Sequence, residues 1–366
     1  MSWPRYMLLV NNLLPCYSLS LNKLNTLSRN VQKFLSNKLP SQILFYKINH
    51  SKREFSSLIK ANKCPKQEGC IRSLLNPWWV TGFVDGEGCF TLSVVQNKST
   101  LKWIVQLSFQ IAVHKKDLYL LKHINNFFGV GTITKQRSES INYRVRSVKD
   151  LAIIISHFEK YPLLTHKYLD YKLFKKVVEL IQSKEHLTTE GLQKIVAIKA
   201  SMNTGLSGML KTAFSDITTT HRPLLAGTQK IVDLNWLAGF TSAEGSFMVK
   251  IAISSSHRLG FQVKLVFALT QHIRDELLMR SLTSYLDCGL LRERKGGKAA
   301  DYQVEKLSDL ADKILPFFYK YPILGIKYKD FEAFCKVVEL MKNKAHLTEQ
   351  GLYKIRKIKA SMNRGR

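Results

Sequence analysis

Hydrophobic and polar residues alternate strictly along two short stretches that lie far apart in the chain. In the first stretch, Phe90, Leu92 and Val94 are apolar, whereas Thr91 and Ser93 between them are polar. In the second stretch, the apolar residues Phe247, Val249, Ile251 and Ile253 alternate with Ser246, Lys250 and Ser254. Successive side chains of a strand point to opposite faces, so each stretch predicts a β-strand with one buried and one exposed face.

Helical patterns surround these strands. Asn76 followed by Pro77 predicts the start of a short helix before the first strand, and Asp233 predicts the same before the second. Longer helices are predicted over residues 169–183 and, after a capping Thr188, over 189–202. Further β-rich runs cover residues 104–112, 131–146, 261–270 and 290–304. This order predicts an α+β fold with helices on one face of an antiparallel sheet.

The predicted order of elements occurs twice. Residues 161–205 return as residues 321–365 with more than half of the positions identical. We therefore expect two tandem domains of about 150 residues each. The predicted limits are a basic extension over 1–70, a first domain over 71–206, a linker rich in Ser, Thr and Gly over 207–229, and a second domain over 230–366.

The charge balance indicates the class of partner. The 366 residues include 56 Lys and Arg but only 27 Asp and Glu, which leaves a net charge of +29. Such an excess favours a polyanion, above all nucleic acid. No apolar stretch approaches the roughly 18 residues of a spanning helix, which excludes an integral membrane protein. Six cysteines in a chain of this length do not form a disulfide framework.

The extension over residues 1–70 belongs to neither repeat and contains only two acidic residues, Glu54 and Glu68. This composition is typical of a mitochondrial targeting segment. A basic arm without fixed structure, or leader sequence read through from an upstream frame, would have the same composition. The three alternatives remain open at this point.

Two nonapeptides open the repeats at corresponding places. They are VTGFVDGEG over residues 80–88 and LAGFTSAEG over residues 237–245. Together they resemble the two motifs of a single-chain LAGLIDADG homing endonuclease of the organellar, group I intron-encoded type, and the resemblance covers roughly residues 72–366. It implies two pseudo-symmetric domains in one monomeric chain, each with a DNA-binding antiparallel sheet backed by helices. It also implies that the motif helices pack together at the domain interface.

Physical chemistry supports the same arrangement. The small residues Gly82 and Gly239 allow two helices to approach closely, which brings Glu87 and Glu244 together at the helix ends. We expect Gly88 and Gly245 to end these helices in the left-handed conformation. Two carboxylates at the negative ends of helix dipoles repel each other, and a hard divalent cation, Mg²⁺ or Mn²⁺, relieves that repulsion. Such a site suits metal-assisted hydrolysis of a phosphodiester.

The resemblance assigns further residues to the site. It implies that the carbonyl groups of Gly86 and Ala243 add metal ligands, and that Asp85 supports the helix end. Lys167 and Lys327 match a lysine beside the cleavage site. Gln271 matches a glutamine near the attacking water, whereas the first repeat has Val113 at that place. The two half-sites should therefore be chemically unequal, and one DNA strand should be cut faster than the other.

Polar residues on the exposed faces of the predicted strands are the candidates for DNA binding, because β-ribbons fit the major groove. In the first repeat they are Thr91, Ser93, Asn97, Gln106, Ser108, Gln110, Arg144 and Arg146. In the second repeat they are Ser246, Lys250, Ser254, Gln262, Lys264, Arg292, Arg294 and Gln303. Each residue taken singly also fits a merely solvated strand face. Because the two sets differ, we expect an asymmetric target.

The resemblance leaves more than one function open. A site-specific endonuclease that makes a double-strand break and promotes intron mobility is favoured, because both Glu87 and Glu244 are present. The alternative is an RNA maturase that binds group I intron RNA, alone or in addition. A DNA-binding protein without catalysis is a third candidate. The basic extension, and the frequent occurrence of this family in organellar introns, predict a mitochondrial location.

Overall fold

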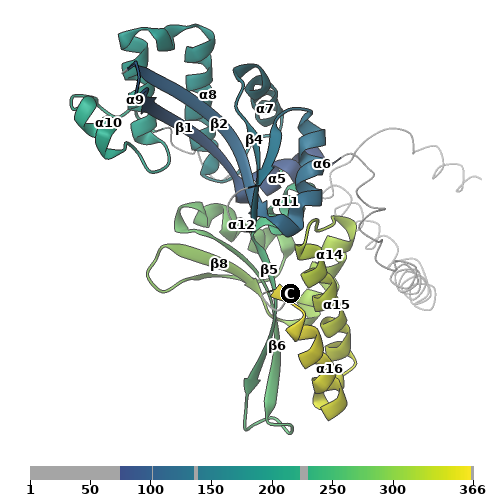
Figure 1. The fold of residues 1–366 in the computed structure, drawn as a ribbon. Coiled ribbons are helices and arrows are strands. Elements are labelled where there is room, and N and C mark those ends of the chain that lie inside the picture. The colour runs from purple at the N-terminus through teal and green to yellow at the C-terminus, as the bar shows by residue number, and fades with distance from the viewer. Residues whose placement is uncertain (1–74, 101, 136–138, 223–229, 364–366) are drawn as a thin grey trace, which may run out of the picture. The chain divides into compact units, whose positions relative to one another are not determined.

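The computed structural model describes residues 75–100, 102–135, 139–222 and 230–363. Predictions about the extension over residues 1–70 lie outside these ranges. The described residues form two repeats with the same order of elements (Figure 1). In the part of the chain that is described, no helix is long and apolar enough to span a membrane.

The first repeat begins with the motif helix α5 (Pro77–Glu87). It ends with a short helix, α10 (Gly208–Ala213), which lies in the segment that the sequence predicted to be a linker. Its elements are α5 (Pro77–Glu87), β1 (Gly88–Gln96), β2 (Trp103–His114), η1 (Lys115–Asp117), α6 (Leu118–Phe128), β3 (Thr132–Lys135), β4 (Ser140–Val145), α7 (Val148–Lys160), α8 (Lys167–Gln182), η2 (Glu185–Leu187), α9 (Thr189–Ser201) and α10 (Gly208–Ala213).

The second repeat follows the same plan to the last described helix. Its elements are α11 (Leu234–Glu244), β5 (Gly245–Ile253), β6 (Phe261–His272), η3 (Ile273–Asp275), α12 (Glu276–Leu286), β7 (Leu290–Glu293), β8 (Ala299–Val304), α13 (Leu307–Asp309), η4 (Leu310–Ile314), α14 (Leu315–Lys320), α15 (Lys327–Lys342), η5 (Ala345–Leu347) and α16 (Glu349–Ala360).

Each repeat contains one four-stranded antiparallel sheet, with the strand orders β1-β2-β4-β3 and β5-β6-β8-β7. The predicted runs over 131–146 and 290–304 are each a hairpin of two short strands. Burial alternates along β1, as the sequence pattern predicted. The predicted α+β class with two pseudo-symmetric sheets is therefore confirmed.

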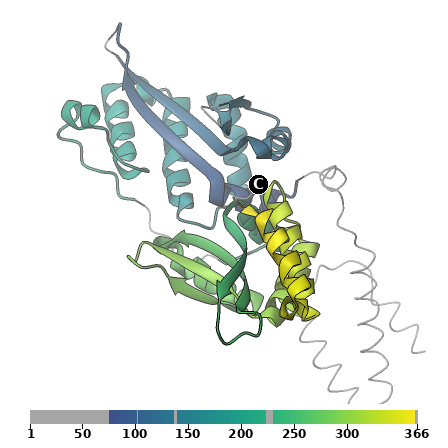
Figure 2. The ribbon, with the colours of Figure 1, turned by 60° about the horizontal axis from the view of Figure 1, so that its bottom comes forward.

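The buried face of each sheet packs against helices through aromatic side chains. In the first core, the ring centroids of Phe90 and Phe109, from neighbouring strands, lie 5.2 Å apart. In the second core, the ring centroids of Phe247 and Phe267 lie at the same distance. The helices near the C-terminus, coloured yellow in Figure 2, lie along one side of the green sheet. The opposite face of each sheet is left for polar residues.

The two motif helices α5 and α11 pack directly against each other where the repeats meet (Figure 1). A Cβ atom on Gly82 would lie 2.0 Å from the Trp236 carbonyl oxygen, and one on Gly239 would lie 1.9 Å from the Trp79 carbonyl oxygen. No side chain fits in either place. The prediction that small residues allow this close approach is confirmed.

The ends of the motif helices differ from the sequence prediction. Asn76 accepts hydrogen bonds from the Trp78 and Trp79 amides, as expected of an N-cap. Gly88, however, has φ −76° and ψ 153°, and Gly245 has φ −68° and ψ 148°, so both are extended and not left-handed. The left-handed prediction was wrong because each strand begins directly after the helix. Glycine is needed for space instead, since a Cβ on Gly88 would lie 2.4 Å from Val84 Cγ1.

The second repeat accommodates one more residue in the helical segment before Tyr321 than the first repeat has before Tyr161. Helix α7 of the first repeat is regular, whereas its counterpart has a π-helical turn, η4, between α13 and α14. A π-turn absorbs one inserted residue without disturbing the helix on either side. The spacing between sheet and following helices is therefore kept in both repeats.

The segment predicted as a linker is partly folded against the first repeat. Helix α10 lies within it, with Leu210 buried in the first core, and Phe214 packs on Trp103 at 5.3 Å. Arg222 forms an ion pair with Asp170 at 3.1 Å. Residues 223–229, the rest of the predicted linker, lie outside the described residues.

Candidate functional site

Glu87 and Glu244 are the last residues of α5 and α11, the two helices that pack together. A Cβ on Gly86 would lie 2.3 Å from Ala243 Cβ and 3.1 Å from Glu244 Cγ, so the helix ends are in direct contact. Burial raises the pKa of the Glu87 carboxyl, and the negative charge of Glu244 raises it further. The two acids are thus close enough to interact, as the sequence predicted.

Two lysines from outside the motif helices complete this cluster. Lys167 Nζ donates hydrogen bonds to the carbonyl oxygens of Val84 at 2.9 Å and Gly86 at 2.8 Å. Lys327 Nζ donates to the carbonyl oxygen of Ala243 at 2.5 Å. Burial lowers the pKa of both ammonium groups, while the charges of the nearby acids act in the opposite direction. Each lysine thereby satisfies carbonyl groups at a helix C-terminus, where positive charge is favourable.

The cluster offers oxygen atoms to a cation but no dense set of side-chain ligands. Among the described residues there is no group of three or more His, Cys, Asp and Glu that could hold a metal ion. Two carboxylates remain, with the carbonyl oxygens of Gly86 and Ala243, each of which has a second lone pair beyond its bond to lysine. Mg²⁺ is commonly held by one or two carboxylates together with substrate phosphates. The donor set therefore fits a hard divalent cation.

Asp85 connects the two repeats beneath the acids. Its carboxylate accepts hydrogen bonds from the Leu164 amide at 2.9 Å, from the Thr165 amide at 3.1 Å and from Thr165 Oγ1 at 2.6 Å. Trp236 Nε1 of the second repeat donates to the same carboxylate at 2.7 Å. All acceptor positions of Asp85 face protein donors, which agrees with a supporting role for this residue.

Gln271 and Val113 occupy matching places near the ends of β6 and β2. Both are partly buried, and each pairs with a residue of the next strand, Ala300 or Ile141. The amide of Gln271 is thus replaced by an apolar side chain in the first repeat. The catalytic role of Gln271 stays a prediction.

The open face of the first sheet carries most of its predicted polar residues together. Thr91 pairs with Ser108 and Ser93 with Gln106 across β1 and β2. One groove is lined by Thr91, Ser93, Gln106, Ser108, Gln110, Arg144 and Arg146. Gln110 Oε1 accepts from Arg144 at 3.1 Å and from Asn142 at 3.2 Å.

Several buried polar atoms of this face lack a hydrogen-bond partner among the described residues. They are Ser108 Oγ, Asn142 Oδ1 and Arg144 Nε. Buried polar groups are almost always paired in native proteins, so these enclosed atoms are exceptions within the sheet. The polar groove beside them gives this face the character of a binding surface.

The second sheet presents a different polar face. Lys250 lies directly opposite Lys264, and both are exposed. Like charges at paired positions destabilise a sheet, so this pair indicates an anionic partner. Ser246 and Lys250 also line a groove that continues to Arg356 and Lys359 of α16. Gln262 lies on β6 next to this region and is partly buried.

An acid organises the outer part of the second face. Asp301 accepts from Arg294 Nε at 2.9 Å, from Thr270 Oγ1 at 2.7 Å and from Gln303 Nε2 at 3.3 Å. Arg292 lies 3.9 Å from the carboxylate of Glu305. Two predicted binding residues, Arg294 and Gln303, are thus fixed by an acid that the sequence interpretation did not single out.

Four predicted residues lie just beyond strand ends and not on strands: Asn97 after β1, Arg146 after β4, Ser254 after β5 and Arg294 after β7. Asn97 follows the end of β1, and its Oδ1 accepts from the Ser99 and Thr100 amides at 2.9 and 3.1 Å. Ser254 follows the end of β5, and its hydroxyl lies 2.8 Å from His257 Nδ1. The side chains of Asn97 and Ser254 form hydrogen bonds within the turns, because β1 ends at Gln96 and β5 ends at Ile253.

Asn142 and Asp301 are the site residues that sequence reasoning missed. A signal was present, since Asp301 lies two positions before Gln303 and Asn142 two positions before Arg144. Residues two apart on a strand share a face. Each of the predicted runs, 131–146 and 290–304, contains a hairpin turn, so the alternation along the whole run does not show which residues share a face.

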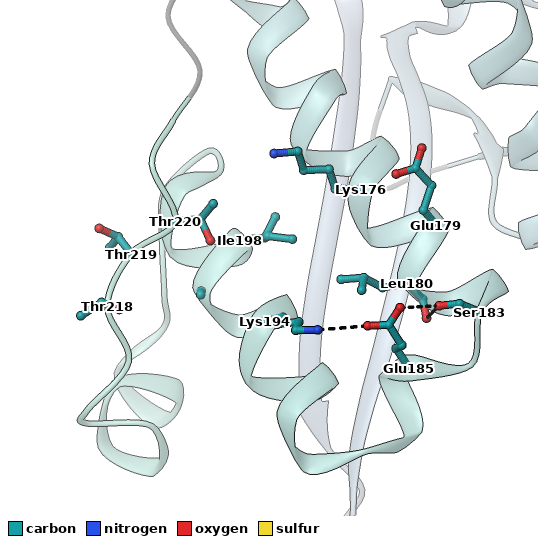
Figure 3. Close-up of a pocket in the computed structure, with 11 residues that line it drawn as sticks. Lys176, Glu179, Leu180, Ser183, Glu185, Lys194, Ile198, Thr218, Thr219 and Thr220 are labelled. Carbon is teal, nitrogen blue, oxygen red and sulfur yellow. Dashed lines mark hydrogen bonds and ion pairs between the residues drawn. The ribbon is translucent and has the colours of Figure 1, made fainter.

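Another hollow lies away from the motif helices, between α8, α9 and residues 218–220 (Figure 3). Two of its charged side chains, Lys194 and Glu185, form an ion pair with each other. Lys194 Nζ lies 3.1 Å from Glu185 Oε2, and Ser183 Oγ donates to Glu185 Oε1 at 3.0 Å. Its two acids each lie near a lysine, Glu185 near Lys194 and Glu179 4.0 Å from Lys175, so the motif region is the stronger candidate.

Comparison with known proteins indicates the family of this chain. The family model described as LAGLIDADG endonuclease matches residues 80–178 and 237–338. The chain is 42% identical over 284 residues to "Probable intron-encoded endonuclease 3" of Neurospora crassa. The aligned region covers 77% of this chain and 53% of that protein. The chain is also 38% identical over 328 residues to "Probable intron-encoded endonuclease 2" of the same fungus, covering 85% and 70%.

Solved structures show the same fold. The homing endonuclease I-SmaMI bound to cleaved DNA is 47% identical, with a TM-score of 0.78, over 80% of this chain and 98% of that one. I-CpaMI bound to uncleaved DNA is 43% identical with a TM-score of 0.75, over 79% and 99%. The chain spans about half the length of the first of the curated relatives but nearly all of these structures. With two matched motifs covering more than half of its residues, this chain belongs to the LAGLIDADG endonuclease family.

Proposed function

We propose that this chain is a homing endonuclease that makes a site-specific double-strand break in a long asymmetric DNA target and so promotes the mobility of its intron. The observation that carries the proposal is the acid pair Glu87 and Glu244, partly buried side by side at the ends of two packed helices. An RNA-binding surface does not need such a pair. No feature of the described residues favours the maturase alternative over cleavage.

We propose different roles for the acids and the lysines of the site. Glu87 and Glu244, with the carbonyl groups of Gly86 and Ala243, would hold the divalent cation, for which we propose Mg²⁺, with Mn²⁺ able to replace it. The cation supplies Lewis-acid activation and charge neutralisation at the phosphodiester. Support comes from I-SmaMI, whose structure with an uncleaved DNA target was determined in the presence of calcium ions.

Lys167 and Lys327 contribute fixed positive charge beside the acids. Their ammonium groups are held by hydrogen bonds to the motif helices, so they need not reorganise as negative charge develops on the phosphate. We propose Gln271 as the group that orients the attacking water in one half-site. Val113 cannot form that hydrogen bond in the other half-site.

The two sheet faces supply recognition. In the first repeat, the polar side chains of Thr91, Gln106 and Gln110 line the groove and offer donors and acceptors to base edges in the major groove. In the second repeat, Lys250 and Lys264 offer charge to the phosphate backbone. Both faces belong to one chain, so we propose that the enzyme acts as a monomer.

We further propose a mitochondrial location. Similar proteins include one described as lying in ND4 intron 1 of Podospora anserina, 45% identical over 119 residues. Another is a cox1 intron-2 protein of Schizosaccharomyces pombe, 30% identical over 121 residues. These host genes belong to the mitochondrial respiratory chain.

The test of the proposed function is cleavage of a plasmid library of organellar inserts. With Mg²⁺ or Mn²⁺ present, we expect double-strand breaks at one site, and with EDTA we expect binding without cleavage. A protein that binds DNA but never cuts with either metal would contradict the nuclease function. In that case, splicing of group I intron RNA becomes the function to test.

Salt dependence tests the lysine pair of the second sheet. Each neutralised phosphate adds roughly 0.9 to the slope of log affinity against log salt. Lys250→Ala and Lys264→Ala are each expected to reduce that slope by about 1. Lys336, which lies 3.4 Å from Glu332 on α15, provides the control, since Lys336→Ala should leave the slope unchanged. Equal slopes in all variants would remove the lysine pair from the DNA interface.

The difference between Gln271 and Val113 predicts unequal cutting of the two strands. A supercoiled target should accumulate nicked circles before linear product, and the nick should lie mostly in one strand. Gln271→Val is expected to slow one strand by about ten- to a hundredfold, in the range of general acid–base effects. Strand-specific end labels measure this. Equal rates for both strands in the unmodified protein would contradict the role of Gln271.

A further inference from the structure

Asp117 and Asp275 occupy N-cap positions but do not cap their own helices. Asp117 precedes α6 and Asp275 precedes α12, and neither side chain accepts a hydrogen bond from the first turn of its helix. Aspartate is among the best N-caps because its carboxylate normally satisfies those amides. Both carboxylates must therefore be engaged elsewhere.

Each carboxylate binds the start of a helix in the opposite repeat. Asp275 Oδ1 accepts from the His166 amide at 2.7 Å and lies 2.9 Å from His166 Nδ1. Asp117 Oδ1 accepts from the Ile326 amide at 2.6 Å. The receiving helices, α8 and α15, have no side-chain cap of their own. The contact thus occurs twice, once in each direction.

The helices capped in this way are those that carry the site lysines. Lys167 is the first residue of α8 and Lys327 is the first residue of α15, directly after the bonded amides. From there each ammonium group reaches the motif helix of its own repeat. A small displacement of the helix start therefore moves the lysine relative to the acids.

The surroundings leave little freedom to either carboxylate. The side chain of Asp275 is only 3% exposed. Gly325, with φ +77°, precedes Ile326, and a Cβ there would lie 2.6 Å from Asp117 Oδ1. The charge of Asp117 also acts on both Lys327 and Glu87. Asp117 is thus close to the reacting groups without being one of the acids that would bind the cation.

We propose that Asp117 and Asp275 are positioning residues that act across the repeats, Asp117 fixing Lys327 and Asp275 fixing Lys167. Each half-site then depends on a residue of the other repeat. The inference rests on the proposed nuclease function for its catalytic consequence, but the positioning itself is open to measurement without cleavage. It explains why two good N-cap residues leave their own helices uncapped.

The first experiment measures lysine accessibility in the full chain. Purified protein is treated briefly with acetic anhydride, and acetylation of Lys167 and Lys327 is followed by mass spectrometry. Asp117→Ala should speed acetylation of Lys327 several-fold and leave Lys167 unchanged, and Asp275→Ala should do the reverse. Asp117→Asn, which keeps an oxygen acceptor, should return Lys327 close to its original rate.

The second experiment measures cleavage of each strand. Asp117→Ala should slow by about ten- to a hundredfold the same strand that Lys327→Met slows, as expected for a displaced group. It should add little to Lys327→Met in the double variant, while DNA affinity stays the same. The control is Thr348→Ala, which removes a cap that Thr348 gives to the Gly351 amide at the start of its own helix, α16. This control should alter neither lysine accessibility nor strand preference.

The outcomes separate the two hypotheses. If the unmodified protein never cuts but acetylation changes as described, the nuclease function fails and the positioning role stands. If the protein cuts but Asp117→Ala accelerates acetylation of both lysines equally, or slows both strands equally, the specific positioning role is wrong. Unchanged acetylation in both alanine variants would also overturn it.

Discussion

Replacing Glu87 by glutamine is expected to reduce double-strand cleavage by about a thousandfold, which corresponds to roughly 4 kcal/mol of transition-state stabilisation. Glutamine keeps the size of the side chain but removes the charge that would hold the cation. Glu244→Gln should have a similar effect because the two acids occupy matching helix ends. The measurement is single-turnover cleavage of the target at saturating Mg²⁺.

The same substitution should stabilise the protein when metal is absent. Burial and the charge of Glu244 raise the pKa of Glu87 above its ordinary value of 4.5, so the folded chain holds this proton more tightly than the unfolded chain. Stability from this group is therefore present below pH 4.5 and is lost as the pH rises through the folded-state pKa. Glutamine cannot ionise, so the Glu87→Gln variant does not lose this stability. In EDTA its melting temperature should exceed that of the unmodified protein, and the difference should grow as the pH rises from 4.5 through the folded-state pKa of Glu87.

Adding a divalent cation should act in the opposite direction on the difference between the two melting temperatures. Ca²⁺ should raise the melting temperature of the unmodified protein but not that of Glu87→Gln, because binding to the folded state alone stabilises it. Glu332→Gln, on the exposed face of α15, should follow the unmodified protein in both conditions. A Glu87→Gln variant that melts at a lower temperature in EDTA would show that the charge of Glu87 stabilises the fold. Normal cleavage by this variant would remove Glu87 from the catalytic site.

Asp85→Ala is expected to destabilise the protein by about 3–5 kcal/mol, lowering the melting temperature by roughly 10 °C. The carboxylate accepts four hydrogen bonds in a buried place, from Leu164, from both donors of Thr165 and from Trp236. Alanine leaves these donors without an acceptor, and each unsatisfied buried donor is costly. Because Trp236 belongs to the second repeat, the loss also weakens the contact between the repeats. Thermal and urea denaturation measure both effects.

The second repeat provides the control at the corresponding position. Among the described residues, Ser242 Oγ accepts one hydrogen bond, from the Leu324 amide at 3.1 Å, and itself donates to the Ala238 carbonyl oxygen at 2.8 Å. Ser242→Ala should therefore cost about 1 kcal/mol. If Asp85→Ala and Ser242→Ala were equally destabilising, the four-bond network would not be the source of stability. A smaller loss for Asp85→Ala would indicate that water replaces the carboxylate.

Much of the fold is predictable because it is expressed in local patterns. Alternation over residues 90–94 and 246–253 identifies the first strand of each sheet, and the caps Asn76 and Asp233 identify the motif helices. The repeated segment identifies two copies of one architecture. These signals depend on residues near one another in sequence, where backbone geometry alone determines which side chains share a face.

Local pattern fails where a residue has two possible uses. Gly88 was expected to be left-handed because glycine often ends helices that way, yet it is extended, and its lack of a side chain serves the Val84 contact instead. Asp301 looks like an ordinary exposed acid on a strand. Only the assembled sheet brings Arg294, Thr270 and Gln303 to its carboxylate.

The sequence by itself determined the two-repeat α+β architecture, the motif helices and the acids Glu87 and Glu244. Only the tertiary structure decided which partners those helices and acids have. Asp117 and Asp275 show the reason, because sequence assigns each to the helix that follows it, whereas each carboxylate binds an amide more than a hundred positions away. Long-range hydrogen bonds depend on how the two repeats pack, and packing is a property of the whole chain and not of any local pattern.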